Sequence, residues 1–274
     1  MLRFSLKWMP FDQPSYVYPS IGVLSYLQEH AAEYRVFGNI YNEALIPFRL
    51  QGIEGYDPLY IQRYGEFVEA VNAGIVRPPQ RSVVSVNKHG EFVKKYLDLL
   101  GTRYFVHSKG DGKNIWAFPV WDYPDSFGTP IWSDEKYEIY QNEKAFPRAF
   151  VVYDYVFSNS DQEIIDTMFS EDIDLRSTIV LENNPSIDNE AMRACQITGD
   201  SPSVSIDNYT PNRVSIEINS DCPGLLFLSD NYYPGWNAFV DNNSVPIYRA
   251  DYTFRAVAIP KGPHTVVFTY NRIR

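Results

Sequence analysis

The sequence predicts a mixed α/β domain followed by an all-β sandwich. Over residues 1–185, helical and strand-like segments alternate, which favours an α+β or α/β domain. Over residues 186–274, apolar and polar residues alternate with a period of two in short stretches separated by turn residues. Closely spaced short strands of this kind are typical of immunoglobulin-like or jelly-roll-like sandwiches.

The composition is that of an ordinary globular protein, and the charge argues against a nucleic-acid partner. Apolar residues make up 45% of the chain and charged residues 21%. The net charge is −10 and no basic tract occurs, whereas binding to phosphate backbones needs clustered Lys and Arg. The chain holds 21 tyrosines, which we attribute to strand preference rather than to a sugar-facing surface.

The first elements are short. Several prolines make residues 1–20 an extended leading segment. Ser20 is placed to cap a helix that runs to about residue 30 with an apolar face. Residues 34–37 form a short strand, and residues 38–55 are irregular. These elements open the mixed domain.

Two helices and a strand follow. Asp57 is a cap residue followed directly by Pro, so we expect a helix over 58–73. A second helix over 91–100 ends at a glycine and leads into a strand over 103–107. Residues 108–135, rich in Gly, Asp, Pro and Trp, predict a long irregular stretch.

The mixed domain ends in strands, and the sandwich begins after a linker. We expect strands over 137–141 and 149–157, a helix over 160–169 and a strand over 178–182. Residues 183–188 form a polar linker, and no helix is expected after it. The alternating positions that predict the sandwich strands are Val204/Ile206, Val214/Ile216/Ile218, Trp236/Ala238/Val240, Phe254/Ala256/Ala258 and Val266/Phe268/Tyr270.

Cys195 and Cys222 are the only cysteines. Their separation fits neither a metal site nor a Cys-x-x-Cys redox pair. They could form one disulfide in an oxidising compartment, but nothing in the spacing demands a bridge. We therefore expect two free, buried thiols.

Six stretches carry a family resemblance: Glu33–Val36, Gly52–Tyr60, Leu97–Phe105, Tyr137–Asn142, Phe146–Phe150 and Ser229–Trp236. The last, Ser-Asp-Asn-Tyr-Tyr-Pro-Gly-Trp, is the most specific. Together they resemble the extracytoplasmic region of the YfhO-like bacterial membrane proteins. That family resembles the multi-pass glycosyltransferases that use lipid-linked sugars, the GT-C superfamily.

The resemblance implies an extracytoplasmic accessory domain at the bacterial cell membrane that guides a cell-envelope glycan or polymer acceptor. In such enzymes the catalytic carboxylate lies in a loop of the membrane part, so we expect no catalytic residue and no cofactor in this chain. We expect an excised piece of a longer protein, with Met1 not the native start, so the lack of a signal peptide carries no information on location.

The partners that the resemblance implies are the protein's own transmembrane domain and a cell-envelope glycan or lipid-linked sugar. Two other functions stay open. The chain could be a non-enzymatic carbohydrate-binding module, in which exposed aromatic rings stack on sugars. It could also be a protein-interaction domain of an envelope assembly, in which an exposed apolar patch meets another protein.

The first candidate site is Tyr56, Asp57 and Arg63. Asp57 is expected to cap a helix whose free N–H groups could also face an anion, with Arg63 on the next turn. In the other interpretation, which we favour, Asp57 only satisfies its own helix end.

The second candidate site is the aromatic cluster Tyr232, Tyr233 and Trp236, with Arg249 and Arg255 nearby. Flat aromatic rings stack on sugars, and arginines hold hydroxyls or phosphates. In the interpretation that we favour, Trp236 anchors the core and the two tyrosines pack at a corner. The arginines then pair across strands with acidic residues: Asp230, Asp241 or Asp251.

No metal site is expected. Asp172 and Asp174 have the spacing of carboxylates that hold a divalent ion, but we interpret them as turn acids. The four histidines are scattered without the spacing of metal ligands. We expect a structural hydrogen bond for His264, which precedes the last strand. Nucleophile elbows and phosphate loops are also missing from the sequence.

Overall fold

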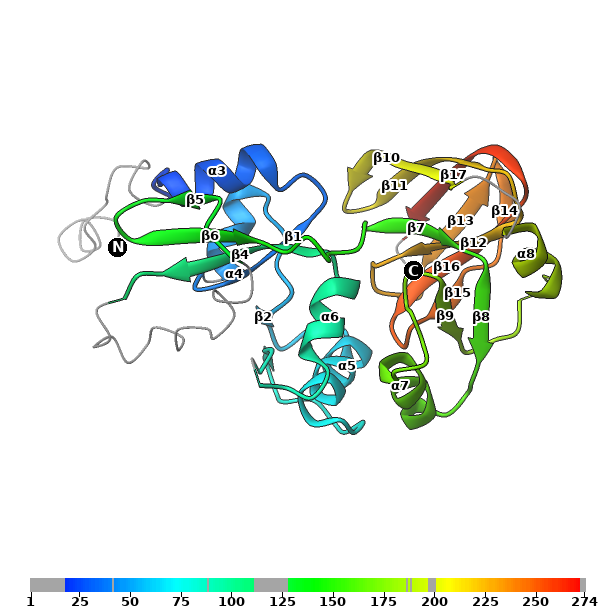
Figure 1. The fold of residues 1–274 in the computed structure, drawn as a ribbon, viewed down its shortest axis with the longest axis horizontal. Coiled ribbons are helices and arrows are strands. Elements are labelled where there is room, and N and C mark those ends of the chain that lie inside the picture. The colour runs from blue at the N-terminus through cyan, green and yellow to red at the C-terminus, as the bar shows by residue number, and fades with distance from the viewer. Residues whose placement is uncertain are drawn as a thin grey trace, which may run out of the picture. The chain divides into compact units, whose positions relative to one another are not determined.

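The computed structural model describes residues 18–40, 42–87, 89–110, 128–185, 187, 189–196 and 201–271 (Figure 1). The chain divides into two compact units: unit 1 is Met1–Gly52 with Tyr104–Gln141, and unit 2 is Ile53–Arg103 with Asn142–Arg274. It is mostly β, with several sheets and few helices. Most of the leading segment 1–20 and much of the irregular stretch 108–135 lie outside the described residues.

Unit 1 is a four-stranded sheet with a helix packed on it. The strand order is β1 (Arg35–Gly38), β4 (Thr102–Ser108), β6 (Tyr137–Gln141) and β5 (Trp132–Ser133). Helix α3 (Gly22–His30) buries Val23, Leu24 and Leu27 against the sheet. The short helix α4 (Asn42–Leu45) and the 3-10 turn η1 (Ile46–Phe48) complete the unit. The three buried residues of α3 lie on the apolar face that the sequence pattern predicts for that helix.

The predicted cap of α3 is wrong. Ile21, not Ser20, occupies the cap position, and no side chain caps the helix. The hydroxyl of Ser20 instead lies 2.9 Å from that of Ser25. Hydroxyl side chains near a helix start compete between several local partners, so the residue type alone does not fix the cap.

Unit 2 holds the remaining helices: α5 (Gln62–Ala73), α6 (Val93–Leu99), α7 (Asp161–Phe169) and α8 (Asn189–Gln196). Strands β2 (Gly55–Tyr56) and β3 (Val83–Val84), which lie before and after α5 in the chain, form a small two-stranded antiparallel sheet. Helix α8 corrects the expectation that no helix follows the linker. Its formation depends on tertiary contacts, including a disulfide described below, that a local pattern does not show.

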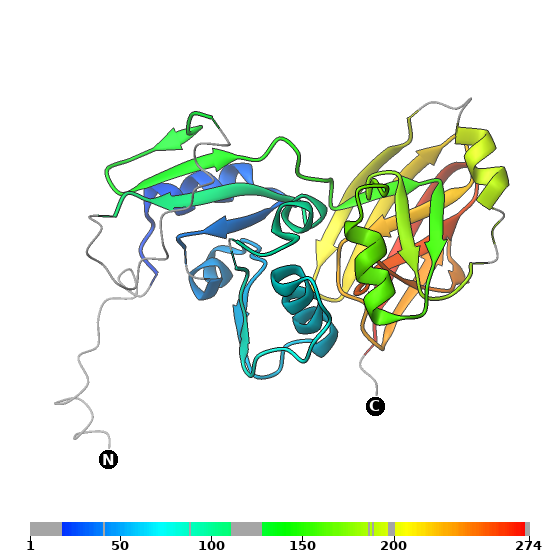
Figure 2. The ribbon, with the colours of Figure 1, turned by 60° about the horizontal axis from the view of Figure 1, so that its bottom comes forward.

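Two larger sheets make up the rest of unit 2. The five-stranded sheet has the order β10 (Ser203–Thr210), β11 (Arg213–Ser220), β17 (Gly262–Tyr270), β13 (Trp236–Val240) and β14 (Asn243–Val245). The six-stranded sheet has the order β7 (Ala149–Val152), β12 (Gly224–Leu228), β16 (Phe254–Ile259), β15 (Tyr248–Ala250), β9 (Thr178–Leu181) and β8 (Asp154–Phe157). In both views α7 and α8 lie outside these sheets (Figure 2).

The six-stranded sheet joins strands from both sides of residue 185. Strand β7 pairs with β12, and β9 pairs with β15. The single strand predicted over 149–157 is two strands: β7 lies at one edge of the sheet and β8 at the other. The chain leaves the first edge at Tyr153, and a sequence pattern cannot show which partner each half will take.

Side chains from the two larger sheets meet in a common core. The guanidinium of Arg255 on β16 lies 5.2 Å from the ring centre of Phe268 on β17. The hydroxyl of Tyr153, just after β7, lies 2.8 Å from that of Ser220 at the end of β11. In the described part of the chain, no helix is both long and apolar enough to cross a membrane.

Candidate functional site

The Ser229–Trp236 motif follows β12 and builds a buried ion cluster. Both carboxylate oxygens of Asp230 accept hydrogen bonds from arginines: Arg148 donates to Oδ1 from Nε at 3.0 Å and Nη2 at 2.6 Å, and Arg255 donates to Oδ2 at 3.0 Å. The hydroxyl of Tyr209 lies 3.0 Å from Oδ2. All three charged side chains are buried. One carboxylate therefore binds two guanidinium groups inside the fold.

Arg255 is held between aromatic rings. Its guanidinium lies 4.0 Å from the ring centre of Trp236 and is only 2% exposed. Its Nε and Nη1 have no hydrogen-bond partner within the described residues. Burial lowers the pKa of Arg255, while the Asp230 carboxylate opposes the shift. Trp236 thus covers a buried cation. The acid that pairs with Arg255 is Asp230, one of the three acids that the packing interpretation names as partners of the arginines.

An aromatic group lies at the surface beside this cluster. Register pairing sets Trp236 of β13 opposite Tyr270 of β17, with ring centres 5.5 Å apart. Tyr233 is 45% exposed, and its ring centre lies 6.4 Å from that of Tyr270. The ring planes in these two pairs are tilted by 54° and 41°, so neither pair is a flat platform. Sequence reasoning missed Tyr270, because only strand pairing brings it to the motif.

A second cluster brings together Arg63, Tyr232 and Arg249 through Glu182. Arg63 on α5 donates to Oε1 of Glu182, and Arg249 on β15 donates to Oε2 at 2.8 Å. Arg249 also lies 4.7 Å from the ring centre of Tyr232. Arg63 is further held by the backbone oxygen of Tyr252 at 2.7 Å. Both arginines are thus engaged within the protein, and sequence reasoning missed Glu182, which lies at the end of a predicted strand.

Tyr56 and Asp57 are not part of either cluster. The carboxylate of Asp57 accepts the N–H of Leu59 at 2.7 Å, which closes a tight turn. Helix α5 begins only at Gln62, with Ile61 at the cap position. The predictions that the helix starts at residue 58 and that Asp57 caps it are therefore wrong, because the Asp-Pro pair is used in a turn instead. Tyr56 is 71% exposed.

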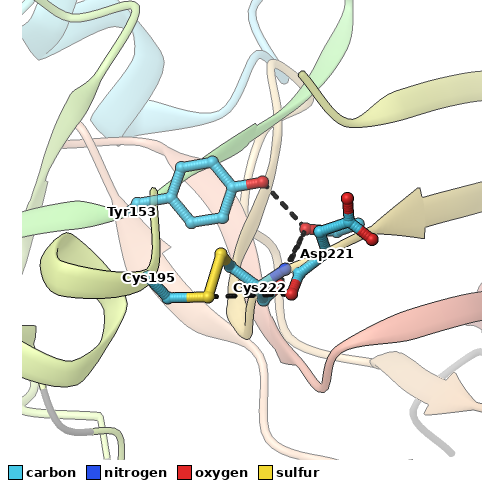
Figure 3. Close-up of a disulfide and its surroundings, with 5 residues drawn as sticks. Tyr153, Cys195, Asp221 and Cys222 are labelled. Atoms are coloured by element: carbon cyan, nitrogen blue, oxygen red, sulfur yellow. Dashed lines mark hydrogen bonds between the residues drawn. A yellow bond between two sulfur atoms is a disulfide. The ribbon is translucent and has the colours of Figure 1, made fainter. Parts of the chain in front are cut away.

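Cys195 and Cys222 form a disulfide (Figure 3). It joins α8 to the turn between β11 and β12, with the two Cα atoms 5.7 Å apart. Ser220 supports this turn, since its hydroxyl lies 2.7 Å from the backbone oxygen of Cys222 and 2.8 Å from the Tyr153 hydroxyl. The expectation of free thiols is wrong. Sequence spacing could not reveal the bond, because α8 itself was not predicted.

The other candidates have local structural roles. The Oδ1 atom of Asp174 accepts the N–H of Arg176 at 3.0 Å, as expected for a turn acid. The ring of His264 lies 2.5 Å from Oδ2 of Asp241 and 3.1 Å from the backbone oxygen of Lys261. The Asp241 hydrogen bond raises the pKa of His264. Over the described ranges, no group of three or more His, Cys, Asp and Glu side chains could hold a metal ion.

The comparison with known families adds one finding. Residues 185–272 match the model of the family described as bacterial membrane protein YfhO. No curated protein matches the chain, and no solved structure does. The match includes α8, both disulfide cysteines and the Ser229–Trp236 motif, so the resemblance expected from the sequence is confirmed there. The C-terminal region of this chain, residues 185–272, is therefore similar to the YfhO family of bacterial membrane proteins.

Proposed function

We propose that the chain is an extracytoplasmic accessory domain of a glycosyltransferase-like membrane protein, and that it guides a cell-envelope glycan or polymer acceptor without catalysing transfer. The observation that carries the location is the Cys195–Cys222 disulfide. Disulfides persist in oxidising compartments and are rare where thiols are kept reduced. The family match to a membrane protein supports the association with a membrane. The protein's own transmembrane domain is then the first partner.

The fold that we propose for this role is an immunoglobulin-like or jelly-roll-like sandwich in unit 2. The contacts between Arg255 and Phe268 and between Tyr153 and Ser220 support it, because each joins one large sheet to the other. Loops at the ends of such sandwiches commonly carry binding residues on a rigid base. The Ser229–Trp236 motif is a connection of this kind.

The aromatic group Tyr233, Trp236 and Tyr270 is the surface that we propose for the glycan. Aromatic rings offer a flat apolar face and, in Tyr, a polar tip, which suits the alternating apolar and hydroxyl faces of sugars. Of the two aromatic side chains that the Ser229–Trp236 motif contributes to this surface, Tyr233 is the more exposed. Arg255 is buried behind Trp236, so its role is to fix that ring rather than to hold hydroxyls.

Labelling from outside the cell tests the location. A Tyr56→Cys substitution in the full-length membrane protein places a thiol at an exposed position. We expect a membrane-impermeant maleimide to label this thiol in intact cells, while a cytoplasmic thiol protein is labelled only after lysis. Labelling of Tyr56→Cys only after lysis would place the domain on the other side and refute the proposal.

A binding titration tests the glycan contact. We expect soluble fragments of the cell-envelope glycan to bind the chain with saturation, and Tyr233→Ala to weaken binding about tenfold, since stacking on one ring contributes on the order of 1 kcal/mol or more. Tyr56→Ala removes an exposed tyrosine elsewhere in unit 2 and serves as the matched control. Absence of saturable binding, or equal effects of the two variants, would contradict the acceptor role and the carbohydrate-module alternative alike.

One observation favours the alternative of a protein-interaction domain. The end of β2 and the turn after it expose Tyr56 and Leu59, which are 71% and 88% exposed. Adjacent exposed apolar side chains are a common feature of contact surfaces. If this turn binds a protein of the envelope, the paired substitution Tyr56→Ser and Leu59→Ser will abolish crosslinking to that protein and leave glycan binding unchanged. Loss of glycan binding in the same variant would argue against two separate surfaces.

A further inference from the structure

A pocket of about 240 Å³ lies in unit 2, away from the clusters described above. Helix α6, the loop between β6 and β7, and the turn between α7 and β9 supply its walls. Its polar and aromatic lining residues are Lys95, Asp98, Lys144, Phe146, Asp174 and Arg176. Three of these side chains are cations, in a chain whose net charge is −10. The local excess of positive charge therefore needs an explanation.

Neutral groups hold two of the cations at the pocket. Lys95 donates to the backbone oxygens of Phe169, at 3.4 Å, and Ser170. Arg176 donates to the backbone oxygen of Lys144 at 2.5 Å and lies 4.3 Å from the ring centre of Phe146. Carbonyl oxygens and an aromatic face position these groups without neutralising their charge.

The two acids in the lining lower the formal charge of the pocket to +1, since three cations face two carboxylates. Asp174 uses Oδ1 to accept the N–H of Arg176 and close its own turn. Asp98 accepts the side-chain N–H of Asn142 at 2.7 Å. Burial raises the pKa of Asp98, although Asn142, Lys144 and Arg176 all act in the opposite direction. Among the described residues, neither carboxylate comes within 4.0 Å of a charged nitrogen of Lys95, Lys144 or Arg176, so neither acid forms an ion pair with these cations.

The shape of the pocket limits the size of an anion. Pockets for larger organic ligands span roughly 300–1,000 Å³. A pocket of about 240 Å³ suits a single charged group with a short carbon chain. A planar guanidinium beside two ammonium groups matches the several oxygens and the double charge of a phosphate better than a single carboxylate. The ring of Phe146 offers an apolar wall for the carbon part.

We propose that this pocket binds a phosphate group, with Lys95, Lys144 and Arg176 as its cationic contacts. The phosphate comes either from free inorganic phosphate or from the phosphate ester of a larger envelope molecule. The site goes beyond the proposed acceptor role: it rests on this pocket alone and not on the contact at Tyr233. A chain that does not bind phosphate in this pocket can therefore still bind glycan at Tyr233, and the reverse also holds.

Calorimetric titration of the chain with inorganic phosphate and with glycerol phosphate at low ionic strength tests the site. We expect saturable binding of at least one probe. Tighter binding of glycerol phosphate identifies the ester as the source, and equal or weaker binding identifies free phosphate. No saturable binding of either probe overturns the proposal.

Charge variants separate a built site from general attraction. Lys144 is exposed and its side chain has no hydrogen bond or ion pair within the described residues, so Lys144→Gln preserves the fold. We expect it to weaken phosphate binding about tenfold, the loss typical of one charged contact. Lys261→Gln makes the same change of charge at an exposed position in the β16–β17 turn. We expect it to bind phosphate like the unsubstituted chain, and equal weakening by both variants refutes the site.

Discussion

At the scale of single residues, Asp251 shows how burial controls a charge. It lies in the turn between β15 and β16 and is fully buried. Its Oδ1 accepts the N–H of Val180 at 2.8 Å, while Oδ2 has no partner within the described residues. Burial raises the pKa of Asp251 to about 7. Its backbone φ is +44°, in the left-handed region that Asn tolerates well.

We expect Asp251→Asn to stabilise the protein above pH 7. The folded pKa lies above the ordinary value of 3.8, so the folded state holds a proton that the unfolded state has lost. Stability is therefore fully present below about pH 4 and falls as the pH rises towards 7. Asparagine stays neutral, so urea unfolding should show a gain on the order of 1–3 kcal/mol at pH 8 and a smaller gain at pH 4.

The exposed acid Asp207 supplies the control for this measurement. Asp207→Asn removes the same charge from the surface strand β10. Its free energy of unfolding should differ little from that of the unsubstituted chain at either pH. A gain for Asp251→Asn that is equal at pH 4 and pH 8 would contradict the assignment of the proton to Asp251.

Asp230 carries the buried cluster of the Ser229–Trp236 motif. Asp230→Ala removes the carboxylate that pairs with the buried Arg148 and Arg255, and breaking a buried ion pair typically costs about 3–5 kcal/mol. We expect this loss in the free energy of urea unfolding, with Asp207→Ala, at an exposed position, as the comparison. An Asp230→Ala loss below about 1 kcal/mol would mean that the cluster is open to water.

At the scale of elements, α8 depends on its disulfide. The bond ties this short helix, which ends at Gln196, to the buried Cys222. Isolated helices of this length are marginal in water, so packing and the covalent link decide whether it forms. The local sequence pattern failed here for that reason.

We expect the double substitution Cys195→Ser and Cys222→Ser to lower the free energy of unfolding by about 2–4 kcal/mol, because the bond closes a loop of 27 residues. Amide hydrogens of α8 should exchange faster with solvent in this variant. A reducing agent should destabilise the unsubstituted chain by a similar amount and leave the variant unchanged. An effect of the reducing agent on both would point to a cause other than this bond.

At the scale of the whole molecule, the two larger sheets decide what can fold as a unit. Strands β7 and β9 come from before residue 185 and complete the six-stranded sheet. The interior strand β12, which pairs with the edge strand β7, is buried along its whole length. Removal of β7 would expose this apolar strand as a sheet edge, which favours aggregation.

A truncation series tests this dependence. We expect residues 53–103 joined by a short glycine linker to residues 142–274, which together keep unit 2 with all strands of both large sheets, to melt cooperatively when followed by circular dichroism. A fragment of residues 186–274 lacks β7, β8 and β9 and should aggregate or melt without cooperativity. A cooperative melt of the shorter fragment would instead support the domain boundary at residue 185 that the sequence predicts.

The sequence locates the candidate site only in part. It identifies Trp236 and Arg255 as neighbours of one motif, and its Phe146–Phe150 stretch contains Arg148. It does not show that Arg148 meets Asp230, that Tyr270 meets Trp236 or that Glu182 joins Arg63 to Arg249. Each pair is far apart along the chain, and no local periodicity encodes which strands become neighbours.

The sequence by itself determined the alternating strands of the C-terminal region, because the alternation of apolar residues is a local property of an extended chain. It also carried the resemblance to the YfhO family, whose model matches residues 185–272. Only the tertiary structure decided the split of residues 149–157 into two strands, the turn at Asp57 and the bond between Cys195 and Cys222. These features depend on which distant partner offers the better hydrogen bond or contact. That competition is resolved when the chain packs, not by the residue pattern.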